Sequence, residues 1–275
     1  MQRLSIATIA AALLAAPAFA QSTDAPKSGP SLTETLGIDP ETGAAILQEA
    51  QEPEKPKWTG SVNASGSLSQ GNTNKRTAGV AADAERRGED DRLTLGFAWN
   101  YSDEKDATKT WTISQRRTRG NAKYDYFLAE KTYAYVNASA ENDKFSDLNL
   151  RLVLGAGAGR QFYEEDDFKL SAELGLAYYD EDRYVGMDED YVAARVAYSL
   201  EYTPRDNITF LQDVEALPGL EDAADIYVRK DSRIRLTVTD RMFTQFQWVL
   251  DYDNTPAAGL DRVDHLFLIG VGWEF

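Results

Sequence analysis

Apolar and polar residues alternate with a period of two from residue 58 to residue 275. In residues 58–69 the even positions are apolar or small, and the odd positions carry hydroxyl or amide groups. Residues 93–101 and 192–202 repeat the alternation with larger apolar side chains. A period of two is typical of a β-strand with one apolar face, whereas a helix repeats every 3.6 residues. The pattern therefore predicts a succession of β-strands.

Twelve strands account for the alternation. With its turn, each takes about 18 residues, more than the ~10 that a transmembrane β-strand needs, and an even count is typical of single-chain bacterial barrels. We therefore predict an all-β fold, an antiparallel transmembrane β-barrel of about twelve strands. A secreted β-sandwich is the alternative architecture. The predicted strands cover residues 58–70, 75–86, 91–102, 109–127, 130–142, 147–162, 167–180, 190–203, 207–216, 225–238, 241–253 and 262–275.

The strand predicted over residues 109–127 changes phase along its length. Trp111 and Ile113 are apolar at odd positions, whereas Tyr124 and Tyr126 are at even positions. One extra residue in a strand shifts the phase, so we expect a β-bulge near residues 118–120. The alternative is that the first half of this strand stands above the membrane.

The connections between the predicted strands also alternate. Outer-membrane barrels have long outer loops and short periplasmic turns, which a soluble sandwich has no reason to sort. We therefore expect both ends of the barrel on the periplasmic side. The long or acidic connections include residues 103–108, 181–189, 217–224 and 254–261, and the short ones include residues 128–129, 204–206 and 239–240.

The first 57 residues divide into two segments. Residues 1–20 have the layout of a secretory signal peptide, with an apolar stretch and a small-x-small motif that ends at Ala20. We expect cleavage after Ala20 and a mature protein in the cell outer membrane; an uncleaved anchor is the alternative. Residues 21–57 hold five of the nine prolines and no aromatic residue, which predicts an acidic, flexible periplasmic extension. Asp39 and Pro40 could begin one short helix that includes the apolar residues 44–47, as a small plug or a partner-binding segment.

The barrel portion resembles two known patterns. Gly270, Trp273 and Phe275 resemble the C-terminal signal that the barrel assembly machinery recognises, although Leu268 stands where that signal prefers a polar residue. Residues 124–128 (YDYFL), 143–145 (DKF) and 155–159 (GAGAG), together with Arg151, resemble the salt-induced outer-membrane protein family over residues 58–275. This resemblance implies a bacterial outer-membrane barrel linked to osmotic or ionic stress, without an assigned function or catalytic residues.

Composition excludes several classes of function. The 275 residues carry a formal net charge of −16, which argues against nucleic acid as a partner. The absence of cysteine excludes disulfides and thiolate sites, and a single histidine excludes a multi-histidine metal site. We expect no cofactor. The partners that we expect are outer-membrane lipid and lipopolysaccharide, with Trp58, Tyr202, Phe267 and Trp273 in aromatic girdles at the membrane interfaces.

The inward phase of the predicted strands carries charges of both signs. They could form a mutually neutralising network that fills a structural barrel. They could equally line a water-filled pore and set its ion selectivity. Both interpretations stay open on sequence alone. The predicted inward charges are Asp83, Glu85, Arg117, Arg119, Lys123, Asp125, Arg151, Glu173, Arg195, Glu201, Asp213, Glu215, Arg229, Asp231, Arg233, Arg235 and Asp251.

Candidate chemistry is sparse, and we predict that the chain is not an enzyme. His265 is the one possible imidazole base, but no serine lies within four residues, so we expect an exposed side chain at the barrel rim. The three glycines of residues 155–159 lack nucleotide-loop spacing, so we expect them to face the lumen and relieve crowding. An acidic segment offers weak candidates for binding Ca²⁺ or Mg²⁺ near lipopolysaccharide, although its spacing is not that of an EF-hand and we expect a solvated loop. These candidates are Asp180, Asp182, Asp188 and Asp190.

Overall fold

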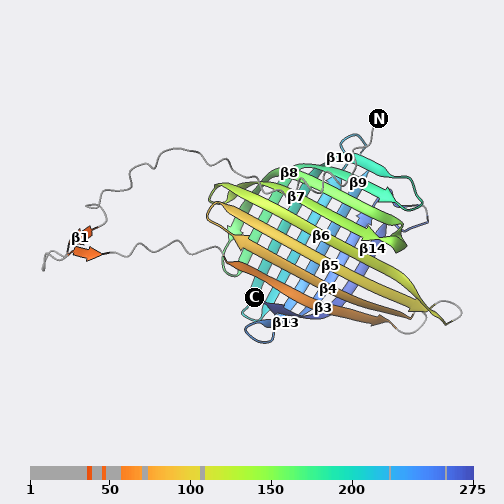
Figure 1. Ribbon diagram of the computed structural model, residues 1–275, viewed down its shortest axis with the longest axis horizontal. Helices are drawn as coiled ribbons and strands as arrows, with labels where there is room; N and C mark the ends of the chain where they lie inside the picture. The colour runs from red at the N-terminus through yellow and green to blue at the C-terminus, as the bar shows by residue number, and fades with distance from the viewer. Residues whose placement is uncertain are drawn as a thin grey trace. The chain divides into compact units, whose positions relative to one another are not determined.

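The structure is a computed structural model that describes residues 57–69, 74–105, 109–222, 224–257 and 259–275, with the backbone of residues 36–38 and 45–47. Its main unit is a closed barrel of twelve antiparallel strands, β3 to β14, which confirms the predicted fold class (Figure 1). Each strand pairs with its neighbours in the chain, and β14 pairs with β3. The strands are β3 Trp58–Ser69, β4 Lys75–Arg87, β5 Asp91–Lys105, β6 Trp111–Ala129, β7 Thr132–Asp143, β8 Leu148–Glu164, β9 Phe168–Arg183, β10 Glu189–Arg205, β11 Ile208–Pro218, β12 Ile226–Thr237, β13 Met242–Asp253 and β14 Val263–Glu274.

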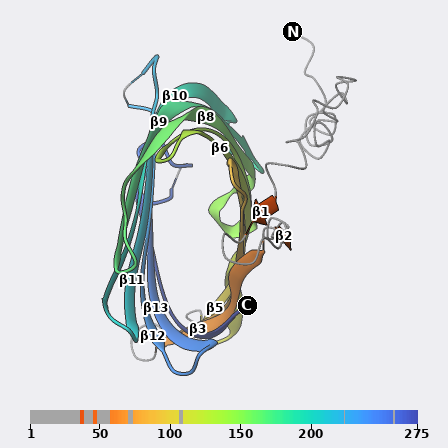
Figure 2. The same cartoon turned by 90° about the vertical axis from the view of Figure 1, so that its left-hand side faces the viewer.

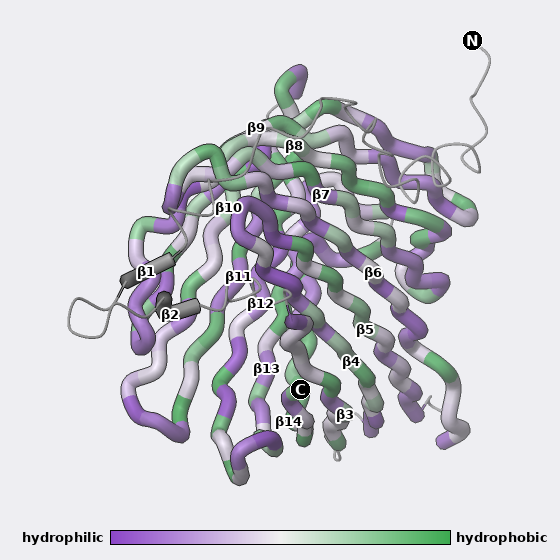
Figure 3. The backbone as a smooth tube through the Cα atoms, turned by 60° about the vertical axis from the view of Figure 1, so that its left-hand side comes forward, coloured by the Kyte–Doolittle hydropathy of each residue, from purple (hydrophilic) through white to green (hydrophobic). Residues whose placement is uncertain are grey.

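The barrel wall separates apolar from polar side chains. Apolar and polar positions alternate along the strands (Figure 3). On β5, Leu95 and Phe97 are exposed on the outside, whereas Ser61 and Asn63 of β3 are buried inside. An apolar exterior around a polar interior is typical of a transmembrane β-barrel, in which alternate residues face lipid and lumen.

The two ends of the barrel differ in the length of their connections. At one end, which we call the turn end, the connections are short, as between β6 and β7, where two residues intervene. At the other, which we call the loop end, they are longer, and nine residues separate β13 from β14. The short helix η1 (Lys144–Ser146) also lies at the loop end, between β7 and β8. The predicted alternation of connections is confirmed.

The bulge in β6 lies closer to the loop end than we expected. Ser102 of β5 pairs with Gln115, and Asp103 pairs with Ile113, which leaves Ser114 as the extra residue. The prediction of a bulge at residues 118–120 is therefore wrong. Only the two apolar residues before Ser114 keep the odd phase, so one extra residue at that point is enough to shift the rest of the strand.

The smaller unit holds two short strands. β1 (Leu36–Ile38) and β2 (Ala45–Leu47) form an antiparallel pair, with Leu36 opposite Leu47. The predicted helix is therefore wrong at residues 45–47, because a helix of one turn is costly to nucleate and the apolar triplets pair instead. The predicted signal peptide, its cleavage site and the remainder of the extension, Asp39 and Pro40 included, lie outside the described residues. No helix among the residues that the structure describes is long and apolar enough to cross a membrane.

The last barrel strand closes the ring. β14 pairs with β3 over six residues, from Ile269 opposite Gly66 to Glu274 opposite Ser61, the shortest ladder in the barrel. Beyond this ladder, the backbone N–H of Phe275 donates to the carbonyl oxygen of Gly60 at 3.0 Å. The backbone of Phe275 therefore belongs to the seam that closes the barrel.

Candidate functional site

Two cavities lie inside the described part of the barrel. The ring of strands is oval in cross-section (Figure 2). A cavity of about 240 Å³ lies towards the loop end, and a larger one of about 380 Å³ lies next to it. Arg229 lines the larger cavity, while the residues that it contacts, Glu141 and Asp251, line the smaller one. A layer of charged side chains therefore separates the two spaces. We call this layer the constriction, formed by Arg117, Glu141, Arg151, Arg229 and Asp251.

Glu141 on β7 is the first centre of the constriction. Its carboxylate lies 2.7 Å from Arg117 Nη2, 2.9 Å from Arg119 Nη1 and 3.4 Å from Arg151 Nη1. Only 3% of Glu141 is exposed. A carboxylate taken out of water is stabilised only by such partners, so Glu141 depends on these guanidinium groups and they depend on it.

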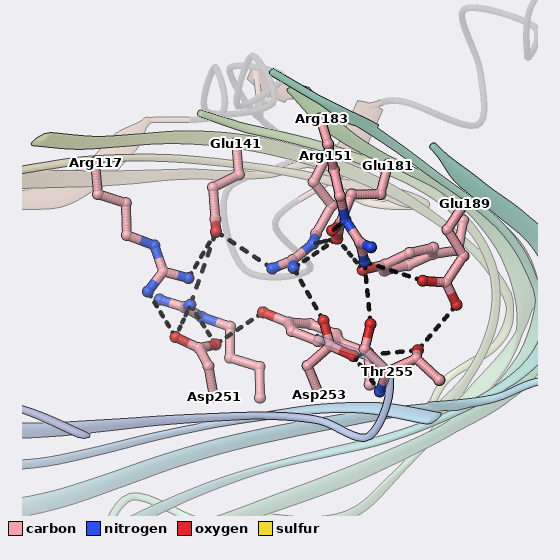
Figure 4. Close-up of polar contacts among 12 residues, drawn as sticks. Arg117, Glu141, Arg151, Glu181, Arg183, Glu189, Asp251, Asp253 and Thr255 are labelled. Carbon is pink, nitrogen blue, oxygen red and sulfur yellow. Dashed lines mark hydrogen bonds and ion pairs between the residues drawn. The ribbon is translucent and has the colours of Figure 1, made fainter. Parts of the chain in front are cut away.

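Asp251 on β13 is the second centre (Figure 4). Its Oδ2 lies 2.7 Å from Arg117 Nη1, and its Oδ1 lies 2.7 Å from Arg229 Nη1. The hydroxyl of Tyr227 donates to the same Oδ1 at 2.7 Å. Arg117 thus joins the two carboxylates with its two terminal nitrogens.

Three ion pairs of the constriction residues cross the lumen. β6, which carries Arg117, and β13, which carries Asp251, are separated by four strands on one side of the ring and six on the other. Arg229 Nη1 lies 3.9 Å from Glu141 Oε2, and Arg151 Nη2 lies 3.5 Å from Asp253 Oδ2, also between distant strands. The opposite walls of the oval are therefore tied together by charge at this level.

The network continues into the longest loop. Arg183 Nη2 donates to the carbonyl oxygen of Thr255 at 3.1 Å, and Thr255 Oγ1 donates to Glu189 Oε1 at 3.0 Å. Pro256, Ala257 and Leu260 of the same loop line the smaller cavity. The loop between β13 and β14 is thus held against β9 and β10 and forms part of the cavity wall.

The acidic segment forms the solvated loop that we expected only over residues 184–188, which are exposed, while the residues on either side belong to β9 and β10. β9 extends to Arg183, and Glu181 is 4% exposed, with its carboxylate 2.7 Å from Arg151 Nη2. Alternation divides the acidic run, because Glu181 and Glu189 face inward while Asp182 and Asp190 face outward. Among the described residues, no group of three such side chains could hold a metal ion. Of the weak metal candidates, Asp182 accepts a hydrogen bond from Asn149 Nδ2 at 2.7 Å and Asp190 accepts one from the Tyr178 hydroxyl at 3.3 Å; Asp180 lies opposite Asp190 in the ladder, and Asp188 accepts from the Arg183 backbone N–H at 3.2 Å.

Charges around the larger cavity pair mainly along the wall. Arg195 Nε lies 2.6 Å from Glu215 Oε1 on the next strand, and Arg233 pairs with Asp213 on the next strand. Polar groups therefore line the space without filling it. The structure places ten of the predicted charges around this cavity, namely Asp83, Arg119, Lys123, Glu173, Arg195, Asp213, Glu215, Arg229, Asp231 and Arg233. Two others lie nearer the turn end, where Glu201 pairs with Lys169 at 3.0 Å and Arg235 pairs with Glu274 at 2.7 Å.

Two buried tyrosines on β7 face glycines on β8. Tyr133 is fully buried, and a Cβ built on Gly159 would lie 2.4 Å from its ring. A Cβ on Gly157 would lie 2.7 Å from the Tyr135 hydroxyl oxygen. The expectation that these glycines relieve crowding inside the barrel is confirmed, because only a missing side chain leaves room for the rings.

Sequence reasoning missed the most connected carboxylate. Glu141 was absent from the predicted inward charges, as were Glu181 and Asp253. A signal was present, because the odd positions of β7 are polar or aromatic from Tyr133 onward, while the even positions from 134 to 140 are alanine or valine. Extending that phase to the end of β7 places Glu141 inside.

His265 lies on the outer surface of β14 and is exposed. Its Nδ1 accepts a hydrogen bond from Trp248 Nε1 at 3.2 Å. Within the described ranges, no hydroxyl or carboxylate side chain hydrogen-bonds to this imidazole. The prediction that the chain is not an enzyme stays a prediction.

Comparison with known families decides the classification. The model of a family described as "Protein of unknown function, DUF481" matches residues 62–275. The chain belongs to this family. The match to the DUF481 family begins within β3 and covers the rest of the barrel. The family's description mentions no salt response, so the expected link to osmotic or ionic stress stays a prediction. A search of curated proteins finds no match.

Solved barrels are similar to this DUF481 member only distantly. A NanC porin in a rhombohedral crystal form is 11% identical, with a TM-score of 0.48 and coverage of 78% of this chain and 98% of the other. A KdgM porin in complex with disordered oligogalacturonate is 10% identical, with a TM-score of 0.44 and coverage of 79% and 99%. The translocator domain of the autotransporter NalP from Neisseria meningitidis is 13% identical, with a TM-score of 0.42 and coverage of 82% and 90%. At these values the matches transfer no substrate to this chain.

Proposed function

We propose that the chain forms a narrow, charge-lined pore for small ions or hydrophilic solutes in the bacterial outer membrane. The observation that supports this most is the polar interior, in which cavities of about 380 and 240 Å³ are lined by paired charges of both signs. A barrel whose lumen only needed filling could use apolar side chains, whereas a polar lumen is typical of a water-filled channel.

The pore is oriented with its loop end outward and its turn end towards the periplasm, as the lengths of the connections favour. The apolar exterior and the sequence of residues 1–20 support export and an outer-membrane location, with cleavage after Ala20. Lipid, lipopolysaccharide and the barrel assembly machinery are the partners of such a protein. The salt- or osmotic-stress role implied by the family resemblance is tested by comparing the growth of a deletion strain at low and raised osmolarity.

A structural barrel with a closed lumen is the second candidate. The observation that favours it is the set of ion pairs across the lumen, in particular Arg117 with Asp251 and Arg229 with Glu141. While these pairs hold, a solute has to pass between them. The pore proposal therefore predicts weak conductance in the wild-type chain and stronger conductance when the crossing is removed.

Single-channel recording of the refolded mature barrel in a planar bilayer separates the two candidates. We expect small, stable conductance steps for the wild type and larger steps for Arg117→Met, because this variant removes the ion pair that Arg117 makes across the lumen with Asp251. The control is Arg86→Met, which removes a cation from the exterior and should leave the steps unchanged. Silence from wild type and Arg117→Met, each shown to be folded by its heat-dependent gel mobility, would support the closed barrel.

A further inference from the structure

The exterior of the barrel carries polar side chains in the outward phase of β11 and β12. The outward residues between positions 150 and 158 of β8 and between positions 170 and 176 of β9 are aliphatic, with Leu174 and Leu176 well exposed. On β11 and β12, the outward phase that includes Phe210 and Ile234 also includes Gln212, Lys230 and Ser232. Polar groups in a lipid-facing phase are costly unless they find partners.

We call the outward residues Gln212, Lys230 and Ser232 the polar band. Its amide and hydroxyl groups take part in hydrogen bonds along the surface. The hydroxyl of Tyr198 donates to Gln212 Oε1 at 2.5 Å, and Gln212 Nε2 donates to Ser232 Oγ at 3.1 Å. These three residues, on adjacent strands β10, β11 and β12, form a short chain of hydrogen bonds along the outer surface.

Lys230 has no such partner. Its ammonium lies 4.7 Å from the centre of the Trp248 ring, and its neighbours in register are Val214 and Leu250. In the part of the chain that the structure describes, Lys230 makes no ion pair with a carboxylate. A cation over an aromatic ring keeps most of its charge free for an anion.

Aromatic side chains extend from Lys230 across β13 and β14. Trp248 stacks on Phe267 with ring centres 6.1 Å apart, and its Nε1 donates to His265 Nδ1. Phe246 also stacks on Phe267, with ring centres 6.4 Å apart. The result is an exposed aromatic surface with one unpaired cation at its edge.

The depth of Lys230 suits a membrane interface. It lies four residues from Ile226, where β12 begins at the loop end. With a rise of ~3.3 Å per residue and a tilted strand, this is about 10 Å along the barrel axis. A lysine stem can carry its ammonium several ångströms further towards water, so the charge reaches the level of lipid headgroups at the loop end.

We infer that Lys230, Trp248 and His265 form an exterior binding site for the phosphate group of a phosphorylated, multiply acylated lipid in the leaflet at the loop end. Lys230 supplies the opposite charge, and the surface formed by Trp248 and Phe267 packs against the acyl chains and sugar. The inference rests on the proposed membrane location and not on conductance, so a barrel that conducts nothing can still carry the site.

A second copy of the chain fits this surface less well. A closed dimer places the same patch of each copy against itself, so both Lys230 ammonium groups would enter one contact. Like charges in a low-dielectric contact repel, and the described part of the band offers no carboxylate to separate them. A lipid phosphate brings the missing negative charge.

Native mass spectrometry of the full barrel in detergent tests the site. The probes are bis-phosphorylated lipid A and the same lipid with both phosphates removed. We expect the wild type to prefer the phosphorylated lipid and Lys230→Met to bind it about fivefold more weakly, as for one cation near a membrane surface. The matched control is Arg86→Met, because the exterior cation that it removes already pairs with Asp91 at 3.1 Å and lies near the turn end.

A second variant and a competition measurement complete the test. Trp248→Leu should also weaken lipid binding, and heat-dependent gel mobility shows that each variant is folded. Equal binding of the two lipids by the wild type, or unchanged binding by Lys230→Met, would overturn the inference. Complete competition by inorganic phosphate would also overturn it, since a lipid would then be unnecessary. Loss of dimers in Lys230→Met without loss of lipid would assign the surface to a second copy instead.

Discussion

Arg229 and Arg233 lie four residues apart on β12 and point into the same lumen, yet they do different things. Arg229 bonds to Asp251 on the next strand and lies 3.9 Å from Glu141 on the opposite wall. Arg233 stays on its own side, paired with Asp213 on β11. The residue type and phase are the same, so the difference lies in what the facing wall presents at each level.

Water access turns this difference into an energetic one. Glu141 is almost completely buried, whereas the side chain of Asp213 is 47% exposed. Removing one partner of a buried ion pair typically costs about 3–5 kcal/mol, while a solvated pair contributes about 0–1 kcal/mol. The constriction should therefore brace the barrel, and the charges of the larger cavity should mainly set the potential within it.

Breaking the constriction should give the largest effect. Glu141→Gln removes the charge that Arg117, Arg119 and Arg151 share, and we expect the free energy of unfolding to fall by about 3–5 kcal/mol. Urea unfolding of the barrel in lipid vesicles measures this. Glu201→Gln is the matched control, since its pair with Lys169 is exposed and should contribute less than about 1 kcal/mol. Equal losses in the two variants would show that burial does not separate the two kinds of pair.

Packing between β8 and β9 can be probed with a methyl group. Gly157→Ala would bring its Cβ to 2.3 Å from the carbonyl oxygen of Leu174, so we expect a loss of about 1–3 kcal/mol in the same unfolding measurement. Gly120→Ala is the control, because nothing lies within 4 Å of its Cβ and a gain of about 0.4–1 kcal/mol is expected. An unchanged free energy of unfolding for Gly157→Ala would mean that β8 and β9 can move apart at this position without loss of stability.

Reversing one charge of the larger cavity should change selectivity more than stability. Arg233→Glu places a third carboxylate beside Asp213 and Asp231, so we expect the pore to shift towards cations. The reversal potential across a KCl gradient measures the shift, and the unfolding free energy should fall less than for Glu141→Gln. Arg241→Glu, in the exposed turn before β13, is the control. An unchanged reversal potential in a conducting Arg233→Glu barrel would place the selective region elsewhere.

Local alternation was enough to predict the barrel, because each strand has one face towards lipid and one towards the lumen. The same signal located Arg117, Arg229 and Asp251 on the inner face. It failed where the phase changes, at Ser114, because a single extra residue leaves no mark on composition. It also failed for residues 45–47, because three consecutive apolar residues are compatible with both a helical turn and a short strand.

The partners of each charge could not be predicted from the sequence. Arg117 and Asp251 are 134 residues apart, and their contact depends on the narrow dimension of an oval barrel rather than on either local segment. Glu141 was missed although the predicted strand over residues 130–142 contains it, because the inward phase was not followed to the end of that strand. The phase of a strand determines whether a residue faces lipid or lumen, whereas the cross-section of the barrel determines which charged residue it contacts.

The short ladder between β14 and β3 has a kinetic consequence. Every other ladder joins strands that follow one another in the chain, so hairpins can form them with short loops. The seam alone joins residues separated by the whole barrel, as in the bond from Phe275 to Gly60, and it carries the largest loss of chain entropy. We expect ring closure at this seam to limit the rate of folding, with the hairpins already formed when the last strand finds the first.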